Sequence, residues 1–192
     1  MTAKSYHHGG LRDALVKAGR DILEADGEAA LTLRACARKA GVSHAAPQHH
    51  FATVVDLLAD IAATGFEEFV KALDDVSASA ASPAAKLKAM GQGYVTFAWT
   101  NAAVYRLMFS SRTAVKSERL HRVMVAAWEQ LATCVSEAAG PDDVDAKAAH
   151  VWAAVHGFAT LTLERRLPPH VDQYRALKLM IDGLPLAIGV RA

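Results

Sequence analysis

Residues 31–51 read LTLRACARKAGVSHAAPQHHF, and this stretch decides how the N-terminal part of the chain folds. Thr32 can cap a helix that runs from Leu33 to Ala40, and Gly41 can end that helix in the left-handed conformation. Ser43 can then cap a short second helix that ends near His50. A small residue, Ala37, stands four positions before the glycine and lets the two helices cross closely. The spacing predicts either a helix-turn-helix or an ordinary helical hairpin within a bundle.

The composition of the second helix favours the helix-turn-helix. His44, Gln48 and His49 are spaced as one polar face, and burying that face in a core would leave several polar groups without hydrogen bonds. A short, polar helix after a tight corner is suited to the major groove of DNA, which is about 12 Å wide. We therefore expect a DNA-binding unit before Phe51.

The rest of the chain predicts an all-α protein with about nine helices. Apolar residues recur with a period near 3.6, and many alanines with few β-branched runs disfavour strands. We expect helices over residues 10–26, 33–40, 43–50, 53–74, 83–99, 103–109, 118–139, 143–167 and from 172 onward. Glycine, proline and capping residues mark their ends, as at Gly27, Ser82-Pro83, Gly140-Pro141 and Pro168-Pro169. Asp142 or Asp143 can cap the helix after Gly140-Pro141. Asp172 can cap the last helix, in which Gly183 and Pro185 should bend or end the last turns.

Composition excludes several classes of protein. The chain has 192 residues, of which 52% are hydrophobic and 21% are charged, with a formal net charge of +1. This composition excludes extensive disorder, and no apolar run is long enough to span a bilayer. The N-terminus lacks the apolar block of a secretory signal, so we expect a cytoplasmic protein with reduced thiols at Cys36 and Cys134.

Catalytic and metal-binding patterns are weak. We find no nucleophile elbow, HExxH motif, phosphate loop or paired carboxylates, so we expect no enzyme and no catalytic residues. His44 and His49 are five residues apart, which is poor spacing for two metal ligands on one helix. We therefore expect no metal site and no cofactor.

Two segments of the sequence resemble the TetR family of bacterial transcriptional regulators. The N-terminal resemblance runs from YHHGGLRDALVKAG, residues 6–19, through the GVS corner and the HHF ending to the DLL at residues 56–58. The later segment WAAVHG, residues 152–157, is similar to the signature of a subgroup whose C-terminal region is called the WHG domain. The combination is more specific than either segment alone.

The resemblance implies a domain organisation and a function. Residues 1–52 would form the helix-turn-helix domain, the helix over 53–74 would connect, and residues 75–192 would form a WHG-like domain for ligand binding and dimerisation. The protein would be a homodimer that binds double-stranded DNA at an inverted repeat. It would usually act as a repressor that a small-molecule effector releases from DNA.

Candidate site residues follow from the motif and the resemblance together. The DNA contacts that we expect are Lys4, Thr32, Arg34, Ser43, His44, Gln48, His49 and His50, of which His50 is equally suited to packing. The resemblance places an apolar effector pocket in the C-terminal helices, for which the candidates are Phe66, Phe69, Tyr94, Phe97, Trp128 and His156. An apolar or aromatic effector would suit them, although aromatic residues at helical spacing are more often plain core. The dimer interface would use Trp152, Ala153, Gly157, Leu161, Leu177, Ile181 and Leu184.

Two positions depart from the family pattern. The family commonly has a tyrosine where Gln48 stands and a lysine where Val54 stands, and both usually hold phosphates. Gln48 can still donate a hydrogen bond, whereas Val54 cannot, so each half-site would lose about one charged contact. An alternative function is therefore a helical ligand-binding or dimerisation module whose operator binding is weakened or lost.

Overall fold

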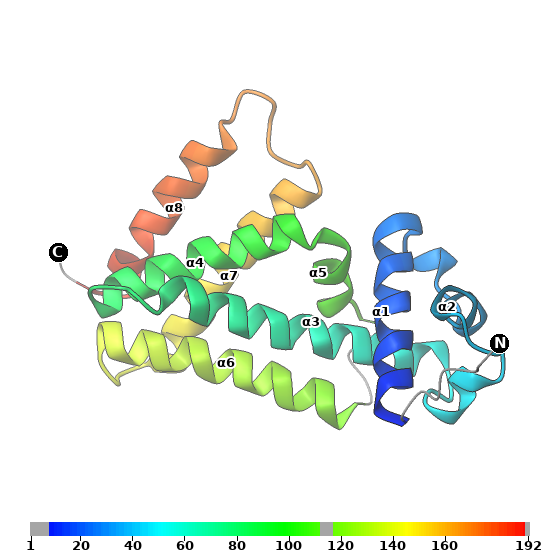
Figure 1. Cartoon of the computed structure of the whole chain (residues 1–192). Helices are drawn as coiled ribbons and strands as arrows, with labels where there is room; N and C mark the ends of the chain where they lie inside the picture. The colour runs from blue at the N-terminus through cyan, green and yellow to red at the C-terminus, as the bar shows by residue number, and fades with distance from the viewer. Residues whose placement is uncertain (1–7, 112–116, 191–192) are drawn as a thin grey trace. The chain divides into compact units, whose positions relative to one another are not determined.

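The fold was analysed in a computed structural model that describes residues 8–111 and 117–190 (Figure 1). Throughout these residues the regular structure is helical, without strands, which confirms the all-α prediction. The α-helices are α1 (His8–Asp26), α2 (Leu33–Ala40), α3 (Val54–Ser77), α4 (Pro83–Thr100), α5 (Ala102–Met108), α6 (Glu118–Ala139), α7 (Val144–Leu163) and α8 (Gln173–Ala187). Two 3-10 helices, η1 (Glu28–Ala30) and η2 (Ala46–His49), complete the set.

The chain divides into two compact units that are not simple halves of the sequence. Unit 1 comprises residues 1–66 and 103–123, and unit 2 comprises residues 67–102 and 124–192. Helices α3 and α6 therefore each supply residues to both units. Most of helix α5 and the first turns of α6 belong with the N-terminal helices, although residues 67–102 separate them in the sequence.

Helices α2 and α3 begin at the capping residues that the sequence indicated. The Thr32 hydroxyl accepts a hydrogen bond from the Ala35 backbone N–H at 3.0 Å and so caps α2. At the start of α3, the Asp56 carboxylate accepts from the Thr53 N–H at 2.8 Å, and the Thr53 hydroxyl accepts from the Asp56 N–H at 3.3 Å. This reciprocal capping box satisfies two donors that the helix itself leaves unpaired.

Helix α1 is the centre of packing in unit 1. A Cβ atom added at Gly19 of α1 would lie 2.8 Å from Ile61 of α3 and 3.5 Å from Cys36 of α2. A Cβ atom here would require the end of the Ile61 side chain to shift, so α1 lies directly against both helices. Burial raises the pKa of the Cys36 thiol to about 11, which keeps it protonated and suited to this apolar contact.

In unit 2, helix α4 packs against both α7 and α8 (Figure 1). A Cβ atom at Gly91 would lie 2.7 Å from Leu184, 2.9 Å from Ile181 and 3.5 Å from Val155. The close approach at this glycine buries those three side chains within one protomer. The expected cap of α8 is confirmed, since the Asp172 carboxylate accepts from the N–H groups of Tyr174 and Arg175.

Several local predictions were wrong. Residues 43–50 form a turn and the 3-10 helix η2 rather than a helix capped by Ser43, because Pro47 lacks an N–H and restricts the residue before it. Asp143 precedes α7 in a left-handed conformation and its side chain caps nothing, and α7 ends at Leu163 instead of near 167. In contrast, α8 contains the buried Pro185 and ends two residues later, at Ala187, which agrees with the expectation that Pro185 bends or ends its last turns.

The helices in the described ranges are all too short or too polar to cross a membrane.

Candidate nucleic-acid interface and aromatic cluster

Gly41 forms the corner between α2 and the segment that follows. Its φ of 70° lies in the left-handed region, and its N–H donates to the Arg38 carbonyl at 3.2 Å. The N–H of Val42 donates to the Ala37 carbonyl at 3.0 Å, so the end of α2 is closed by two backbone hydrogen bonds. The chain thus turns sharply at the position that the sequence indicated.

Pro47 anchors the recognition segment, by which we mean residues 43–50. Its ring is buried, and its carbonyl oxygen accepts hydrogen bonds from the N–H groups of both His50 and Phe51 at 2.9 Å. The Phe51 side chain is only 1% exposed and closes this side of the unit's core. The proline therefore points inward and fixes which side chains of the segment point outward.

The outward side chains of the recognition segment are polar. Ser43, His44, Gln48 and His49 are exposed, and His50 is half-buried. A hydroxyl, an amide and imidazoles can all donate to or accept from base edges and phosphate oxygens. Four predicted contacts thus lie exposed on one short segment, while His50 has the intermediate burial that fits either packing or phosphate contact.

Helix α2 adds two further predicted contacts. Thr32 and Arg34 lie exposed in the first turn of α2, where the N–H groups of a helix favour an anion. The Thr32 hydroxyl oxygen already accepts the capping hydrogen bond, which leaves its proton free to be donated. Lys4 lies outside the described residues.

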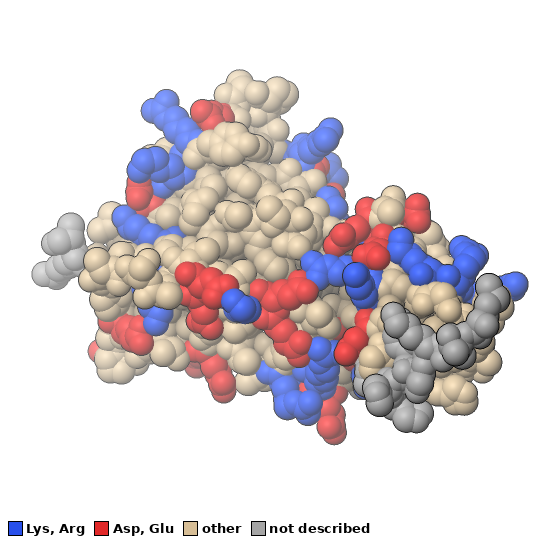
Figure 2. All heavy atoms as spheres, in the orientation of Figure 1, with Lys and Arg blue, Asp and Glu red and all other residues tan. Residues whose placement is uncertain are grey.

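The start of α3 differs from a phosphate site. Val54 is half-buried and has no polar group, and the adjacent carboxylate of Asp56 already accepts the Thr53 N–H. Acidic side chains also gather along α3 on the face drawn in Figure 2. A negative surface repels phosphates, so this face of α3 is unsuited to DNA.

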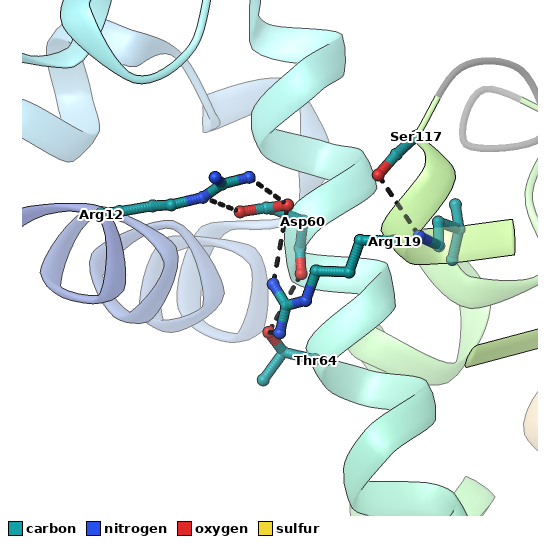
Figure 3. Close-up of polar contacts among 6 residues, drawn as sticks. Arg12, Asp60, Thr64, Ser117 and Arg119 are labelled. Carbon is teal, nitrogen blue, oxygen red and sulfur yellow. Dashed lines mark hydrogen bonds and ion pairs between the residues drawn. The ribbon is translucent and has the colours of Figure 1, made fainter. Parts of the chain in front are cut away.

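The structure also contains a buried carboxylate that sequence analysis missed (Figure 3). Asp60 of α3 is 2% exposed and accepts two hydrogen bonds from Arg12 of α1, at 2.6 and 2.8 Å. Arg119 of α6 lies 3.6 Å from the same carboxylate and also donates to the Thr64 hydroxyl at 3.2 Å. The missed signal was a charged residue between two apolar positions of the core face, Leu57 and Ile61.

Most of the predicted effector residues meet in one aromatic cluster of unit 2. The ring of Phe69 meets the rings of Tyr94 and Phe97 edge to face, with centroids 5.1 and 5.3 Å apart. Tyr94 in turn lies beside His156. Phe66, in contrast, belongs to unit 1, where its ring packs against Phe109. We define the aromatic cluster as Phe69, Tyr94, Phe97, Trp128, Trp152 and His156, and the contacts of the two tryptophans follow.

Trp152 joins the aromatic cluster, although the sequence suggested it for the dimer interface. Its indole lies 6.3 Å from Trp128 and 5.7 Å from the His156 ring, and the residue is 40% exposed. The indole N–H donates to the Tyr94 hydroxyl at 3.3 Å, and that hydroxyl lies 2.8 Å from Nδ1 of His156. Burial lowers the pKa of His156, which favours the neutral imidazole in this chain of hydrogen bonds.

The remaining predicted dimer residues fall into two groups. Ala153 and Leu161 of α7 are exposed, and Gly157 is half-buried with no atom within 4 Å of an added Cβ. Leu177, Ile181 and Leu184 of α8 are buried in the protomer, so their apolar area is already used within one chain. The large exposed apolar residues of α8 are instead Tyr174, Leu179 and Leu186.

Comparison with known proteins identifies the family. A family model described as a Tetracyclin repressor-like, C-terminal domain matches residues 87–184, which is just over half of the chain. The chain belongs to the TetR family. The helix-turn-helix described above is the DNA-binding element of such regulators, and the resemblance stated from the sequence is thereby confirmed at the level of the family. The assignment to the WHG subgroup stays a prediction.

Solved structures agree with membership of the TetR family. A protein with unknown function from Rhodococcus sp. RHA1 is 31% identical, with a TM-score of 0.83 over 96% of this chain and 98% of that one. BioQ of Mycobacterium smegmatis is 26% identical, with a TM-score of 0.62 over 92% and 98% of the two chains. A regulatory protein of the tetR family from Rhodococcus RHA1 shares the fold at 18% identity, with a TM-score of 0.70 over 94% and 98%. A search of curated proteins finds no match.

Proposed function

We propose that this TetR-family protein is a ligand-responsive repressor that binds an inverted-repeat operator as a homodimer in the cytoplasm. The observation that supports it best is the recognition segment, where Ser43, His44, Gln48 and His49 stand exposed beyond a corner fixed by Gly41. These side chains would contact base edges and nearby phosphates, with Thr32, Arg34 and Lys4 on the phosphate backbone. The protein would act as a regulator and not as an enzyme.

Dimerisation would use the exposed apolar residues of α7 and α8. Leu161, Tyr174, Leu179 and Leu186 are apolar or aromatic and are 44%, 67%, 67% and 64% exposed in the protomer. Large apolar residues on adjacent exposed helices mark interaction surfaces. In a twofold-symmetric dimer the same residues of both protomers would be buried at the interface. Gly157 and Ala153 would allow α7 to approach the partner closely.

The effector would bind at the aromatic cluster. The cluster offers several ring faces and edges together with the hydroxyl of Tyr94 and the neutral imidazole of His156. A mostly apolar surface with few polar groups suits an aromatic or otherwise apolar small molecule. Such a molecule would release the protein from DNA if it binds better to a conformation in which the recognition segments are wrongly spaced.

A helical module with weakened or lost operator binding is the second candidate. It is favoured by Val54, which offers no donor at the start of α3, and by Gln48 in place of the family's tyrosine. Helix α3 would then lack a phosphate contact that most relatives have. The two candidates differ in one measurable property, which is saturable binding to a specific DNA sequence.

Selection of bound DNA from a random library, with the purified full chain, tests the proposal. We expect an enriched inverted repeat, and an affinity for it that falls with salt according to the number of phosphates contacted. The variants His44→Ala and Gln48→Ala should weaken binding, whereas His150→Ala, an exposed change on α7, should not. No enriched sequence and no binding at low salt would support the second candidate.

A further inference from the structure

Asp60 is an unusual residue for the buried face of a helix. It is 2% exposed, and the residues at 57–59 and 61–63 are apolar and at most 5% exposed. A carboxylate in such surroundings is unfavourable unless cations compensate it. The compensation comes from two helices that are remote in sequence, through Arg12 of α1 and Arg119 of α6.

The two arginines hold the carboxylate unequally. Arg12 binds both oxygens, through Nε to Oδ2 at 2.6 Å and Nη2 to Oδ1 at 2.8 Å, which is the strong bidentate geometry. Arg119 lies farther from the carboxylate, with Nη1 3.6 Å from Oδ1, while its Nη2 donates a hydrogen bond to the Thr64 hydroxyl at 3.2 Å. Both guanidinium groups therefore share Oδ1, and two positive charges lie beside one negative charge (Figure 3).

Arg12 connects this carboxylate to the DNA-binding helices. Its guanidinium also lies over the ring of Phe51, 5.5 Å from the centroid, directly after the recognition segment. The helix that carries it, α1, touches both α2 and α3 at Gly19. The hydrogen bond to Asp60 raises the pKa of Arg12, whereas burial and the charge of Arg119 act against that rise. The strength of the Arg12–Asp60 ion pair, which holds α1, thus depends on how closely Arg119 approaches the same carboxylate.

We propose that Asp60 is a positioning residue for DNA binding, which holds α1 through Arg12, and that Arg119 competes with Arg12 for the same carboxylate. A shift of the first turn of α6 toward Asp60 would weaken the hold on α1, and a shift away would strengthen it. Helix α6 continues into unit 2, where Trp128 belongs to the aromatic cluster. The proposal rests on the proposed function and names a route by which an effector would loosen the DNA-binding helices.

Charge-neutralising variants test the proposal, because it predicts the opposite sign from simple electrostatics. Removing a negative charge near DNA ordinarily tightens binding, and removing a positive charge weakens it. Asp60→Asn should instead weaken binding to the selected operator by about fivefold or more. Arg119→Gln should leave it at least as tight as in the wild type, because Arg12 then holds the carboxylate alone.

Matched controls remove the same charges from exposed sites of unit 1. Asp26→Asn, at the end of α1, should leave binding unchanged or tighten it. Arg122→Gln, which breaks only an exposed pair with Glu118, should leave it unchanged or weaken it. The proposal is overturned if Asp60→Asn leaves DNA binding unchanged or tightens it, as Asp26→Asn does. It is also overturned if Arg119→Gln weakens DNA binding more than Arg122→Gln does.

Amide hydrogen exchange of the DNA-free protein separates this proposal from the proposed function. Exchange in α1 should be faster in Asp60→Asn than in the wild type, and no faster in Arg119→Gln. If exchange shows this pattern but the protein binds no DNA, the competition between Arg12 and Arg119 is supported and the proposed repressor function is rejected. Faster exchange of α1 in Arg119→Gln would overturn the competition, even if Asp60→Asn fails to fold.

Discussion

Replacing Gly41 with alanine adds one methyl group at the corner of the helix-turn-helix. A Cβ atom added there meets no atom within 4 Å, so the substitution causes no steric clash. Its cost is the left-handed backbone at φ 70°, which is about 1–2 kcal/mol for a residue with a Cβ atom. The DNA-bound protein needs the same corner, so the losses in unfolding and DNA-binding free energy should add up to about 1–2 kcal/mol.

The division of that sum depends on how the free protein responds. If alanine keeps the left-handed conformation, the whole cost appears as a lower free energy of unfolding and the DNA affinity stays unchanged. If the corner relaxes, the protein is less destabilised, but the recognition segment moves and the affinity falls. In this second case the DNA affinity would fall by up to about 5-fold to 30-fold.

Urea unfolding followed by circular dichroism, and fluorescence anisotropy with the selected operator, measure the two losses. Gly41→Asn should give a smaller sum, because asparagine tolerates the left-handed conformation. Gly27→Ala, at φ 79° and ψ 174°, where essentially only glycine is found, should lower stability at least as much without changing the DNA affinity. A sum for Gly41→Ala below about 0.5 kcal/mol, or above about 3 kcal/mol, would refute the reasoning.

Two further predictions concern the dimer and the aromatic cluster. Leu179→Lys should dissociate the dimer without destabilising the protomer, because the side chain is 67% exposed. Val76→Lys on α3 should leave the dimer intact, and sedimentation velocity measures both variants. Because burial lowers the pKa of His156, the unfolded chain takes up a proton there first as the pH falls through about 6.5, so acidification should lower the melting temperature more in the wild type than in His156→Gln.

Each of these predictions has an outcome that contradicts it. If the Leu179→Lys variant remains a dimer, the dimer interface does not include the exposed face of α8. Equal acid sensitivity of the wild type and His156→Gln would show that this imidazole keeps its ordinary pKa, for which exposed His150→Gln serves as the control.

The parts of the fold that depend on neighbouring residues were predictable from the sequence. Thr32, Gly41, Ser82 and Asp172 all act where local rules place them, because a cap or a left-handed turn involves only a few consecutive residues. The local rule failed at Ser43, where the backbone limits of Pro47 favoured a turn and a 3-10 helix over a capped helix.

The candidate site was predictable to a different degree in each unit. The exposed residues of the recognition segment follow from polarity and spacing on one short stretch. In unit 2, the aromatic residues are spaced as core, and spacing does not tell which side chain faces which neighbour. Thus Trp152 belongs to the aromatic cluster, Phe66 packs against Phe109, and Leu177 is buried in the protomer's own core.

By itself the sequence determined the helical class, the glycine corner and the polar recognition segment, since helix periodicity and turn chemistry act over a few residues. Only the tertiary structure decided that residues 103–123 join the N-terminal helices and that Arg12 and Arg119 share Asp60. The two ion pairs join residues 48 and 59 positions apart, and their energy depends on burial, which long-range packing alone creates.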